Sequence, residues 1–309
     1  MRTAHGLAQR YHYGMKSTAV IGRFAPSPTG PLHFGSLVAA LASYLDTRAV
    51  GGRWRLRIDD VDQSRSREAA IAEIPASLAA LGLHWDGPIQ QQSGRTAVYA
   101  EALEGLIRAD QAYPCGCTRR DVAAKAERGP AGMIYPGTCR AGLGADRPAR
   151  SWRFRVNDTP IRFVDRALGV QTTPLDTEVG DFVVRRADGL YAYHLAMVLD
   201  DAALGVTDVV RGADLLPATA PQIALQQALG LPTPRYLHVP VVYAADGRKL
   251  SKTNAAAAID THQPIPALRQ ALEFLNQPLP EPRDTLRVDE LLDWAIRHWT
   301  PSQCMGAKA

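Results

Sequence analysis

A Pro/Gly-rich segment near the N-terminus carries residues suited to binding a phosphate. Residues 23–36 read Arg-Phe-Ala-Pro-Ser-Pro-Thr-Gly-Pro-Leu-His-Phe-Gly-Ser. This order predicts a strand, a tight turn and a helix start, where unpaired backbone N–H groups and the helix dipole favour an anion. His33 is placed to donate a hydrogen bond to that anion, and Gly35 lets a flat base approach the backbone. The alternative is a proline-rich turn with an incidental histidine.

A pair of lysines lies far along the chain, in the run Lys249-Leu-Ser-Lys252-Thr that follows Ala-Asp-Gly. On a loop, two such ammonium groups are suited to hold a triphosphate and to neutralise the charge on departing pyrophosphate. A solvated basic loop is the alternative for this motif taken alone. Both interpretations stay open on these residues.

Three of the four cysteines lie within 25 residues: Cys115, Cys117 and Cys139. Zinc prefers four soft or borderline ligands in a tetrahedron, and these cysteines supply three. Tyr135 and Cys139 form a second short-spaced pair, so the fourth ligand is water, a histidine or, unusually, the Tyr135 oxygen. No catalytic base is evident nearby, so a metal here is expected to be structural. Three free structural cysteines are the alternative.

The composition limits the class of protein. With 46% hydrophobic and 21% charged residues, the chain resembles an ordinary globular protein and not a disordered one. No apolar run approaches the roughly 18 residues of a membrane span, so no membrane contact is expected. Few cysteines in 309 residues argue against a secreted disulfide scaffold and favour a reduced, cytoplasmic setting. The net charge of +4 permits a nucleic-acid partner without requiring one.

Strands and helices alternate in the order expected of an α/β fold with a doubly wound parallel sheet. Strands are predicted at 19–24, 53–58, 206–210 and 236–243, and helices at 35–48, 67–81, 96–109, 191–199, 218–229, 265–275 and 288–298. Such sheets bind ligands outside the carboxyl ends of their strands, which is where the Pro/Gly turn and the acidic run after residue 58 fall.

The pattern also suggests domain boundaries. Residues 1–17 contain no acidic residue and are predicted to be a disordered N-terminal extension. Met15 within it is an alternative translation start. Residues 18–112 and 180–245 are expected to form the two halves of the catalytic domain, separated by a metal-bearing insertion at 113–179. Residues 246–309 are expected to carry the lysine loop and a helical C-terminal region.

Taken together, the two motifs resemble the signatures of class I aminoacyl-tRNA synthetases. Residues 26–35 correspond to the His-Ile-Gly-His signature, and residues 249–253 correspond to Lys-Met-Ser-Lys-Ser. The runs Arg57-Ile-Asp-Asp-Val-Asp62, Trp85-Asp-Gly-Pro88 and Val210-Arg-Gly-Ala-Asp214 resemble the glutamyl branch. The resemblance extends over residues 17–254 and implies a Rossmann-type fold.

The resemblance assigns roles to individual residues. It implies catalytic roles for His33, Lys249 and Lys252, and ATP binding by His33, Gly35, Ser36 and Lys252. It implies a glutamate site made of Arg23, Phe24, Ala25, Pro26, Ser27, Asp59, Tyr193 and Arg211. There an arginine grips a carboxylate and an acidic residue accepts from the ammonium. The family usually has glutamate where this chain has Asp59, so the shorter carboxylate either contacts the ammonium through water or contributes less.

The cysteine motif is similar to the zinc site of the short glutamyl-queuosine tRNA(Asp) synthetases, implying one Zn²⁺ on Cys115, Cys117, Tyr135 and Cys139. Members activate glutamate with ATP and Mg²⁺, without tRNA, and esterify queuosine in the tRNA(Asp) anticodon loop. Only 57 residues follow Lys252, too few for a further anticodon-reading domain, and a monomer is expected.

Other functions stay open at this stage. One alternative is a glutamyl-tRNA synthetase that charges the 3′ end of tRNA(Glu). A second is a catalytically silent, zinc-bearing RNA-binding module, which the intact motif residues disfavour. A third is a small-molecule ligase or nucleotidyltransferase, which the insertion and the glutamate-site residues disfavour.

Overall fold

The computed structural model describes residues 19–130, 132–144, 147–243, 247, 257–281 and 285–306. The predicted N-terminal extension and both predicted catalytic lysines, Lys249 and Lys252, lie outside these residues. Among the residues described, no helix has the length and apolar character needed to cross a bilayer.

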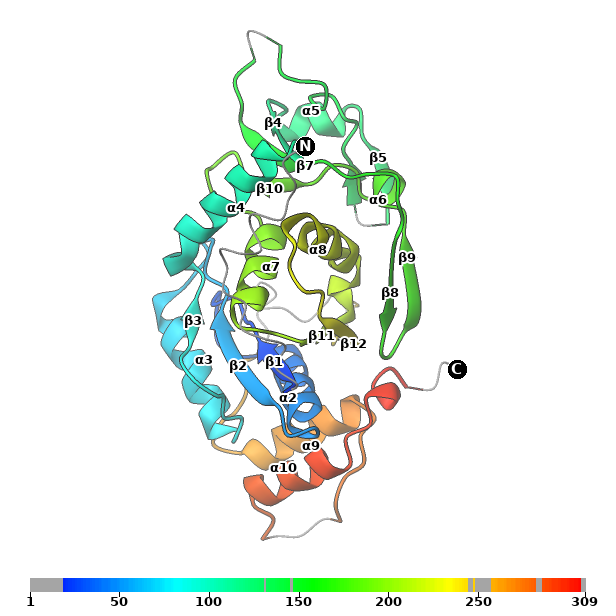
Figure 1. Cartoon of the computed structure of the whole chain (residues 1–309). Coiled ribbons are helices and arrows are strands. Elements are labelled where there is room, and N and C mark those ends of the chain that lie inside the picture. Colours follow the sequence, from blue (N-terminus) through cyan, green and yellow to red (C-terminus); the bar gives the residue numbers. More distant parts are fainter. Residues whose placement is uncertain are drawn as a thin grey trace.

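The centre of the molecule is a set of parallel strands, as the sequence predicted. β1 (Ile21–Phe24), β2 (Arg53–Ile58) and β3 (Gln90–Gln91) form one sheet in that order. β11 (Asp208–Gly212) and β12 (Arg235–Val239) are parallel to each other in a second sheet. The Thr207 amide donates to the Ile21 carbonyl at 2.9 Å, so β11 continues the layer beside β1 (Figure 1).

Helices cover both faces of these strands, consistent with a doubly wound arrangement. The helices of the two halves are α2 (Phe34–Arg48), α3 (Glu68–Ala80), α4 (Thr96–Arg108), α7 (Tyr193–Ala203) and α8 (Leu216–Leu229). Short 3₁₀ turns η1 (Ser93–Arg95) and η2 (Ala213–Leu215) precede α4 and α8. Leu41 and Leu45 of α2 pack in one apolar core with Trp54 of β2, all three at 0% exposure. The leucines that recur at helical spacing in α2 therefore belong to the core.

The predicted insertion packs on an antiparallel sheet of β10 (Val183–Arg185), β7 (Ser151–Phe154) and β4 (Ala112–Cys115). This sheet extends past the predicted boundary at residue 179, because its strand β10 follows it in the chain. The insertion also carries α5 (Arg119–Ala123), the hairpin β5 (Glu127–Gly129) and β6 (Gly132–Ile134), and α6 (Leu175–Glu178). In Figure 1 this part lies at the top, above α7 and α8.

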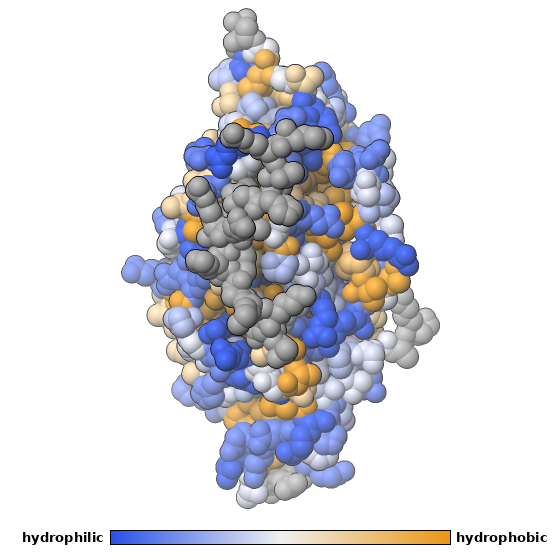
Figure 2. Space-filling view, viewed as in Figure 1, coloured by the Kyte–Doolittle hydropathy of each residue, from blue (hydrophilic) through white to orange (hydrophobic). Residues whose placement is uncertain are grey.

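A long hairpin connects the insertion to the parallel strands. β8 (Ile161–Asp165) pairs antiparallel with β9 (Gly169–Thr173), and β8 also contacts β12. Val164 and Val170 are direct partners in this hairpin and are 65% and 55% exposed. Hydrophobic atoms gather over this end of the hairpin in Figure 2.

The C-terminal region braces the catalytic core. α9 (Pro264–Phe274) and α10 (Val288–Arg297) bury Leu268, Leu272 and Leu291 in the same apolar cluster as α2 (Figure 1). Between α10 and the final 3₁₀ turn η4 (Pro301–Gln303), the Trp299 indole N–H donates to Asp46 of α2 at 3.0 Å.

Several element boundaries differ from the sequence prediction by a few residues; the strand predicted at 206–210, for example, is Asp208–Gly212. Two of the differences have a clear local cause. The helix expected from residue 191 begins at Tyr193, because Tyr191 forms an isolated bridge with Arg185 and Ala192 has extended backbone. The last parallel strand ends at Val239 and does not continue to residue 243. Pro240 follows, and proline has no N–H to extend a ladder.

Candidate active site

A cavity of about 380 Å³ opens at the carboxyl ends of β1, β11 and β12. This is the edge at which parallel α/β sheets bind ligands. The cavity brings together every described residue that the resemblance placed in the glutamate and ATP sites. These are Arg23, Phe24, Ala25, Pro26, Ser27, His33, Gly35, Ser36, Asp59, Tyr193 and Arg211.

The Pro/Gly turn is fixed from two sides. The Asp59 amide donates to the Pro26 carbonyl at 2.9 Å, and the Arg67 amide donates to the Pro28 carbonyl at 2.8 Å. The turn after β1 is therefore tied to the segment after β2. This places Asp59 in the cavity wall beside the turn.

His33 is the N-cap of α2. Its Nδ1 accepts from the Ser36 amide at 3.3 Å, and its Nε2 lies 3.1 Å from the Ser36 hydroxyl. The far side of the turn is also held, since Ala258 bridges to His33 and the Ile259 amide donates to the Leu32 carbonyl at 3.0 Å. The N-terminus of this 15-residue helix faces the cavity and offers the partial positive charge that an anion requires.

A buried ionic network underlies the cavity. The Arg57 Nε donates to Asp59 Oδ1 at 2.6 Å, and the Arg57 Nη1 donates to Asp201 Oδ1 at 2.6 Å. The Arg23 Nε donates to the same Asp201 carboxylate at 3.2 Å. Two buried arginines thus share Asp201, while Asp59 is held at the cavity surface by one of them.

The pKa of Asp59 differs from that of an ordinary aspartate. Burial raises this pKa to about 6, against the opposing effect of the adjacent Arg57 guanidinium. Two further carboxylates, Asp200 and Asp201, also raise it. At neutral pH Asp59 is an anion that faces the cavity, and its protonation falls close to physiological pH.

Arg211 is held in one orientation at the end of β11. Its Nε donates to the His238 Nε2 at 3.2 Å, its Nη1 to the Gln222 side chain at 2.8 Å and its Nη2 to the Thr219 hydroxyl at 2.8 Å. Asp165 fixes the other ring nitrogen of His238 at 2.7 Å. Each terminal nitrogen keeps a second N–H, so a fixed planar cation is presented to the cavity.

The other two aspartates that follow β2, Asp60 and Asp62, contact other parts of the chain. The Asp60 carboxylate accepts from the Ser93 amide at 2.9 Å and from its hydroxyl at 2.7 Å, which fixes η1. Asp62 pairs with Arg186 at 3.0 Å. Of the three carboxylates after β2, Asp59 is the one that lines the cavity.

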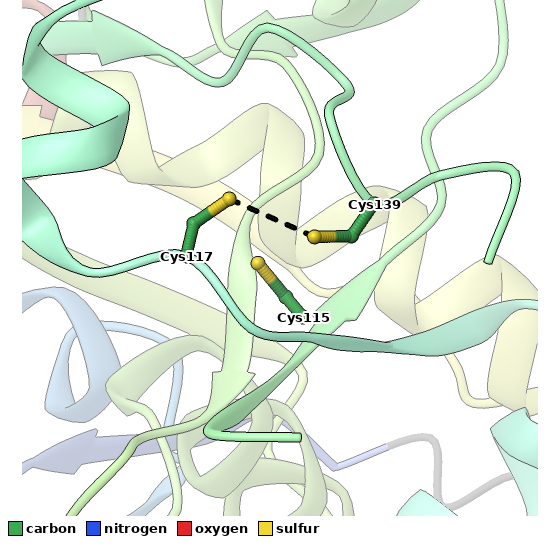
Figure 3. Close-up of side chains that lie close together, drawn as sticks. All are labelled: Cys115, Cys117 and Cys139. Atoms are coloured by element: carbon green, nitrogen blue, oxygen red, sulfur yellow. Dashed lines mark hydrogen bonds between the residues drawn. The ribbon is translucent and has the colours of Figure 1, made fainter. Parts of the chain in front are cut away.

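The three clustered cysteines meet as the spacing predicted. Their sulfur atoms point toward one another in Figure 3, and all three lie within 4.8 Å of each other. The Cys117 and Cys139 sulfurs are 3.6 Å apart. The Tyr135 hydroxyl lies 3.3 Å from the Cys115 sulfur and 3.5 Å from that of Cys117. Zn–S bonds of about 2.3 Å and Zn–O bonds of about 2.0 Å in a tetrahedron separate ligand atoms by roughly 3.5–3.8 Å. The four side chains fit a zinc ion.

Arg153 is a cation in direct contact with this cluster. Its Nε donates to the Cys115 sulfur at 3.3 Å, and its guanidinium carbon lies 3.6 Å from the centre of the Tyr135 ring. Burial alone raises the pKa of the Cys115 thiol, but hydrogen bonds from Tyr135 and Arg153 outweigh that effect and bring it to about 7. A thiol with this pKa is readily present as the thiolate that a metal binds.

Sequence reasoning assigned no role to Arg57, Asp201 or Met197. Arg57 is fully buried inside β2, and Met197 and Asp201 lie on α7, whose first residue Tyr193 lines the cavity. The available signal was a charged residue between Leu56 and Ile58 in a strand predicted to belong to a parallel sheet. Such sheets are covered on both faces, and a buried charge requires a partner.

The fold is that of the class I aminoacyl-tRNA synthetases. The family described as tRNA synthetases class I (E and Q), catalytic domain, matches residues 19–272. The chain belongs to this family and is a ligase of the aminoacyl-tRNA synthetase class. A glutamate-tRNA synthetase from Elizabethkingia anophelis superposes with a TM-score of 0.76 at 25% identity, covering 94% of this chain and 68% of that one. The chain spans 66% of a glutamate tRNA ligase from Elizabethkingia meningosepticum, also with a TM-score of 0.76.

Curated relatives define the group more narrowly. A glutamyl-Q tRNA(Asp) synthetase from Aromatoleum aromaticum is 51% identical over 280 residues, which cover 91% of this chain and 89% of the relative. One from Bordetella bronchiseptica is 57% identical over 261 residues, covering 83% and 82%. Within the class, the chain belongs to the glutamyl-Q tRNA(Asp) synthetase family.

Proposed function

We propose that this enzyme activates L-glutamate with ATP to glutamyl-adenylate without tRNA, and then transfers the glutamyl group to queuosine in the anticodon loop of tRNA(Asp). The observation that carries the proposal is the meeting of a fixed arginine, an ionised aspartate and a helix N-terminus in one cavity. The relatives named glutamyl-Q tRNA(Asp) synthetase supply the acceptor.

The cavity supports glutamate because its charges match those of this amino acid. The guanidinium of Arg211 is suited to a bidentate contact with a carboxylate. The Asp59 anion, which lines the same cavity, is suited to the substrate ammonium. Because Arg57 already occupies Asp59 at 2.6 Å, the ammonium contact uses the remaining lone pairs of that carboxylate.

Activation requires positioning and charge stabilisation and no side-chain nucleophile. A substrate carboxylate oxygen attacks the α-phosphorus of ATP, a new P–O bond forms, and the bond to the bridging oxygen breaks as pyrophosphate leaves with its electron pair and Mg²⁺. The N-terminus of α2 with His33 and Ser36 would hold phosphate oxygens. Lys249 and Lys252 are proposed to hold the departing pyrophosphate.

In the transfer step a hydroxyl oxygen of the acceptor attacks the carbonyl carbon of glutamyl-adenylate. An ester bond forms, the bond to the phosphate oxygen breaks, and AMP leaves with that electron pair. The hydroxyl proton passes to the phosphate or to water. The queuosine side chain carries a cyclopentene diol that supplies this hydroxyl.

Two assays with labelled substrates test the proposal. ATP–pyrophosphate exchange is expected to depend on glutamate, to need no RNA and to be lost in Lys252→Ala. Labelled glutamate is then expected to join queuosine-containing tRNA(Asp), and equally the same tRNA without its 3′-terminal adenosine. Labelling that needs this adenosine, or that persists on tRNA without queuosine, would instead support charging of a tRNA 3′ end.

We also propose that Cys115, Cys117, Tyr135 and Cys139 hold one structural Zn²⁺. Three separations among their ligand atoms support it. The Tyr135 oxygen lies 3.3 Å and 3.5 Å from the Cys115 and Cys117 sulfurs, and the Cys117 and Cys139 sulfurs are 3.6 Å apart, close to the spacing around a tetrahedral ion. The ion would join β4 to the 135–139 segment, within a small cluster that is otherwise poor in apolar side chains. Elemental analysis is expected to find one zinc per chain, lost in Cys117→Ser with Cys139→Ser and retained in Cys304→Ser.

A further inference from the structure

A buried histidine and a buried aspartate stand behind the cavity, next to Arg211. His238 of β12 is the direct partner of Arg211 in the parallel pairing of β11 with β12. The side chains of His238 and Asp165 both have 0% exposure, and neither belongs to the described residues that line the cavity. Any effect of this pair on a substrate therefore passes through another residue. Arg211 is the cavity residue to which His238 is hydrogen-bonded.

Asp165 is held as an anion that only accepts hydrogen bonds. Its Oδ1 accepts from the amides of Ala167 and Leu168 at 3.0 and 2.9 Å. Its Oδ2 accepts from the His238 amide at 3.1 Å and lies 2.7 Å from the His238 Nδ1. Burial on its own raises the pKa of Asp165, but the hydrogen bonds from His238 and from the two amides outweigh it and hold this pKa below its usual value. Because a carboxylate has no proton to give, the His238 Nδ1 must carry one.

The other ring nitrogen of His238 faces two donors. The Arg211 Nε lies 3.2 Å from the His238 Nε2, and the Thr219 hydroxyl lies 3.3 Å from it. An arginine N–H can only donate, so a proton on Nε2 would oppose it directly. Burial lowers the pKa of His238 against the opposing hydrogen bond to Asp165, and the Arg211 charge lowers it further. The two contacts together require a neutral ring with its proton on Nδ1.

This ring fixes the direction of the Arg211 fork. The Nε and Nη2 donate to the His238 ring and to the Thr219 hydroxyl, and these two acceptors are only 3.3 Å apart. The Nη1 donates to the Gln222 side chain. Because the guanidinium is planar and rigid, an acceptor at Nε sets where the terminal N–H groups point. One N–H remains on each terminal nitrogen for a substrate carboxylate.

The acceptors around Arg211 also preserve its charge. In the described part of the chain, its three side-chain acceptors are an imidazole, a hydroxyl and an amide, all neutral. Arg23 and Arg57, in contrast, share the Asp201 carboxylate. The negative charge of Asp165 is separated from Arg211 by the width of the His238 ring, where it polarises that ring without competing for the guanidinium.

We propose that Asp165 and His238 are positioning residues for glutamate activation. Asp165 keeps His238 in the neutral form with its proton on Nδ1, and the Nε2 lone pair of His238 aims the charged Arg211 fork at the substrate carboxylate. This rests on the function proposed above, in which Arg211 binds glutamate. The pair therefore acts on glutamate binding and leaves ATP binding unchanged.

Two substitutions of His238 separate its two hydrogen bonds. In His238→Asn the shorter amide can still donate to Asp165, but Arg211 loses its acceptor. In His238→Gln the longer side chain can place its carbonyl oxygen near the Nε2 position, so Arg211 keeps an acceptor. The KM for glutamate in ATP–pyrophosphate exchange is expected to rise about tenfold in His238→Asn, with kcat and the KM for ATP unchanged. His238→Gln is expected to keep the KM for glutamate within about twofold of the unmodified enzyme.

Tyr236→Phe is the matched control for a loss of stability alone. Tyr236 is buried in the same strand, and its hydroxyl accepts from the Gln226 side chain at 3.3 Å. This variant should unfold at a lower urea concentration and keep the KM for glutamate. Equal glutamate KM values in His238→Asn and His238→Gln would overturn the proposal, as would a KM for ATP that rises in parallel with the KM for glutamate.

A measurement on the unmodified enzyme does not depend on how the variants fold. In ¹⁵N spectra of the histidine-labelled protein, assigned along β12, the His238 ring is expected to carry its proton on Nδ1 and none on Nε2 at neutral pH. A proton on Nε2 would overturn the proposal. Absence of glutamate-dependent exchange in the unmodified enzyme would instead refute the function on which the proposal rests, since the state of the ring is measured separately.

Discussion

Asp201 Oδ1 lies 2.6 Å from the Arg57 Nη1, beneath the cavity at the carboxyl ends of the strands. Arg57 comes from β2 and Asp201 from α7, and both are buried. The same carboxylate also receives Arg23, while Arg57 holds Asp59. The orientation of two cavity residues, Arg23 and Asp59, thus depends on a carboxylate behind them.

Asp201→Asn is expected to destabilise the fold and weaken glutamate binding together. Removing one partner of a buried ion pair costs about 3–5 kcal/mol, because the remaining charges stay buried without compensation. Here two arginines lose their shared anion. Urea unfolding followed by circular dichroism, with the KM for glutamate in pyrophosphate exchange, measures both effects. Asp289→Asn, in the exposed pair with Arg287, is the control and should change neither.

The pH dependence of glutamate activation should follow Asp59. Its pKa of about 6 lies above the ordinary value. The carboxylate is therefore ionised above pH 6, and it loses its negative charge by protonation as the pH falls through that value. If the anion binds the substrate ammonium, kcat/KM for glutamate falls about tenfold between pH 8 and pH 5. Arg57, Asp200 and Asp201 also face this group; the pKa of Arg57 is raised and that of Asp201 is lowered, so these two keep their charge over that range.

Asp59→Asn is the companion measurement. It should lower kcat/KM at pH 8 and flatten the acid limb of the profile. An unchanged limb in this variant would assign the titration to another group and remove Asp59 from ammonium binding.

Much of this arrangement was predictable from the sequence, for identifiable reasons. Arg23, Asp59 and Arg211 lie at or just after the ends of strands that the sequence predicted, and parallel strands present their carboxyl ends at one edge. The short spacings of the cysteines likewise predicted their meeting. In both cases a short stretch of sequence identifies the residues, and the order of strands in the fold brings them together.

The support behind the site was not predictable in the same way. Arg57 and Asp201 are separated by 144 residues, and nothing in either segment specifies the other as its partner. Pairings of this kind depend on how helices and insertion pack, which apolar periodicity does not encode.

Arg211→Lys should separate fixed geometry from charge. Lysine keeps the positive charge but lacks the planar fork, and it leaves the Gln222 and Thr219 oxygens without their donors. The KM for glutamate is expected to rise about 100-fold, which is the loss of one or two charge-assisted hydrogen bonds. Arg186→Lys, at an exposed pair outside the cavity, should leave this KM unchanged. If Arg211→Lys and the unmodified enzyme have the same KM for glutamate, Arg211 does not bind the substrate carboxylate in a bidentate contact.

Tyr135→Phe tests whether the phenol oxygen is part of the zinc site. Besides approaching two sulfurs, this oxygen accepts the Cys139 amide at 2.9 Å, so it holds the third cysteine in place. Its loss should lower zinc affinity by about 10- to 100-fold, measured by competition with a chromogenic chelator. Tyr113→Phe is the matched control, because Tyr113 is equally buried in the insertion but donates to Asp181. It should lose stability and keep zinc affinity. If the two variants retain zinc equally well, the Tyr135 oxygen is a structural hydrogen-bond partner and the fourth ligand is a water molecule.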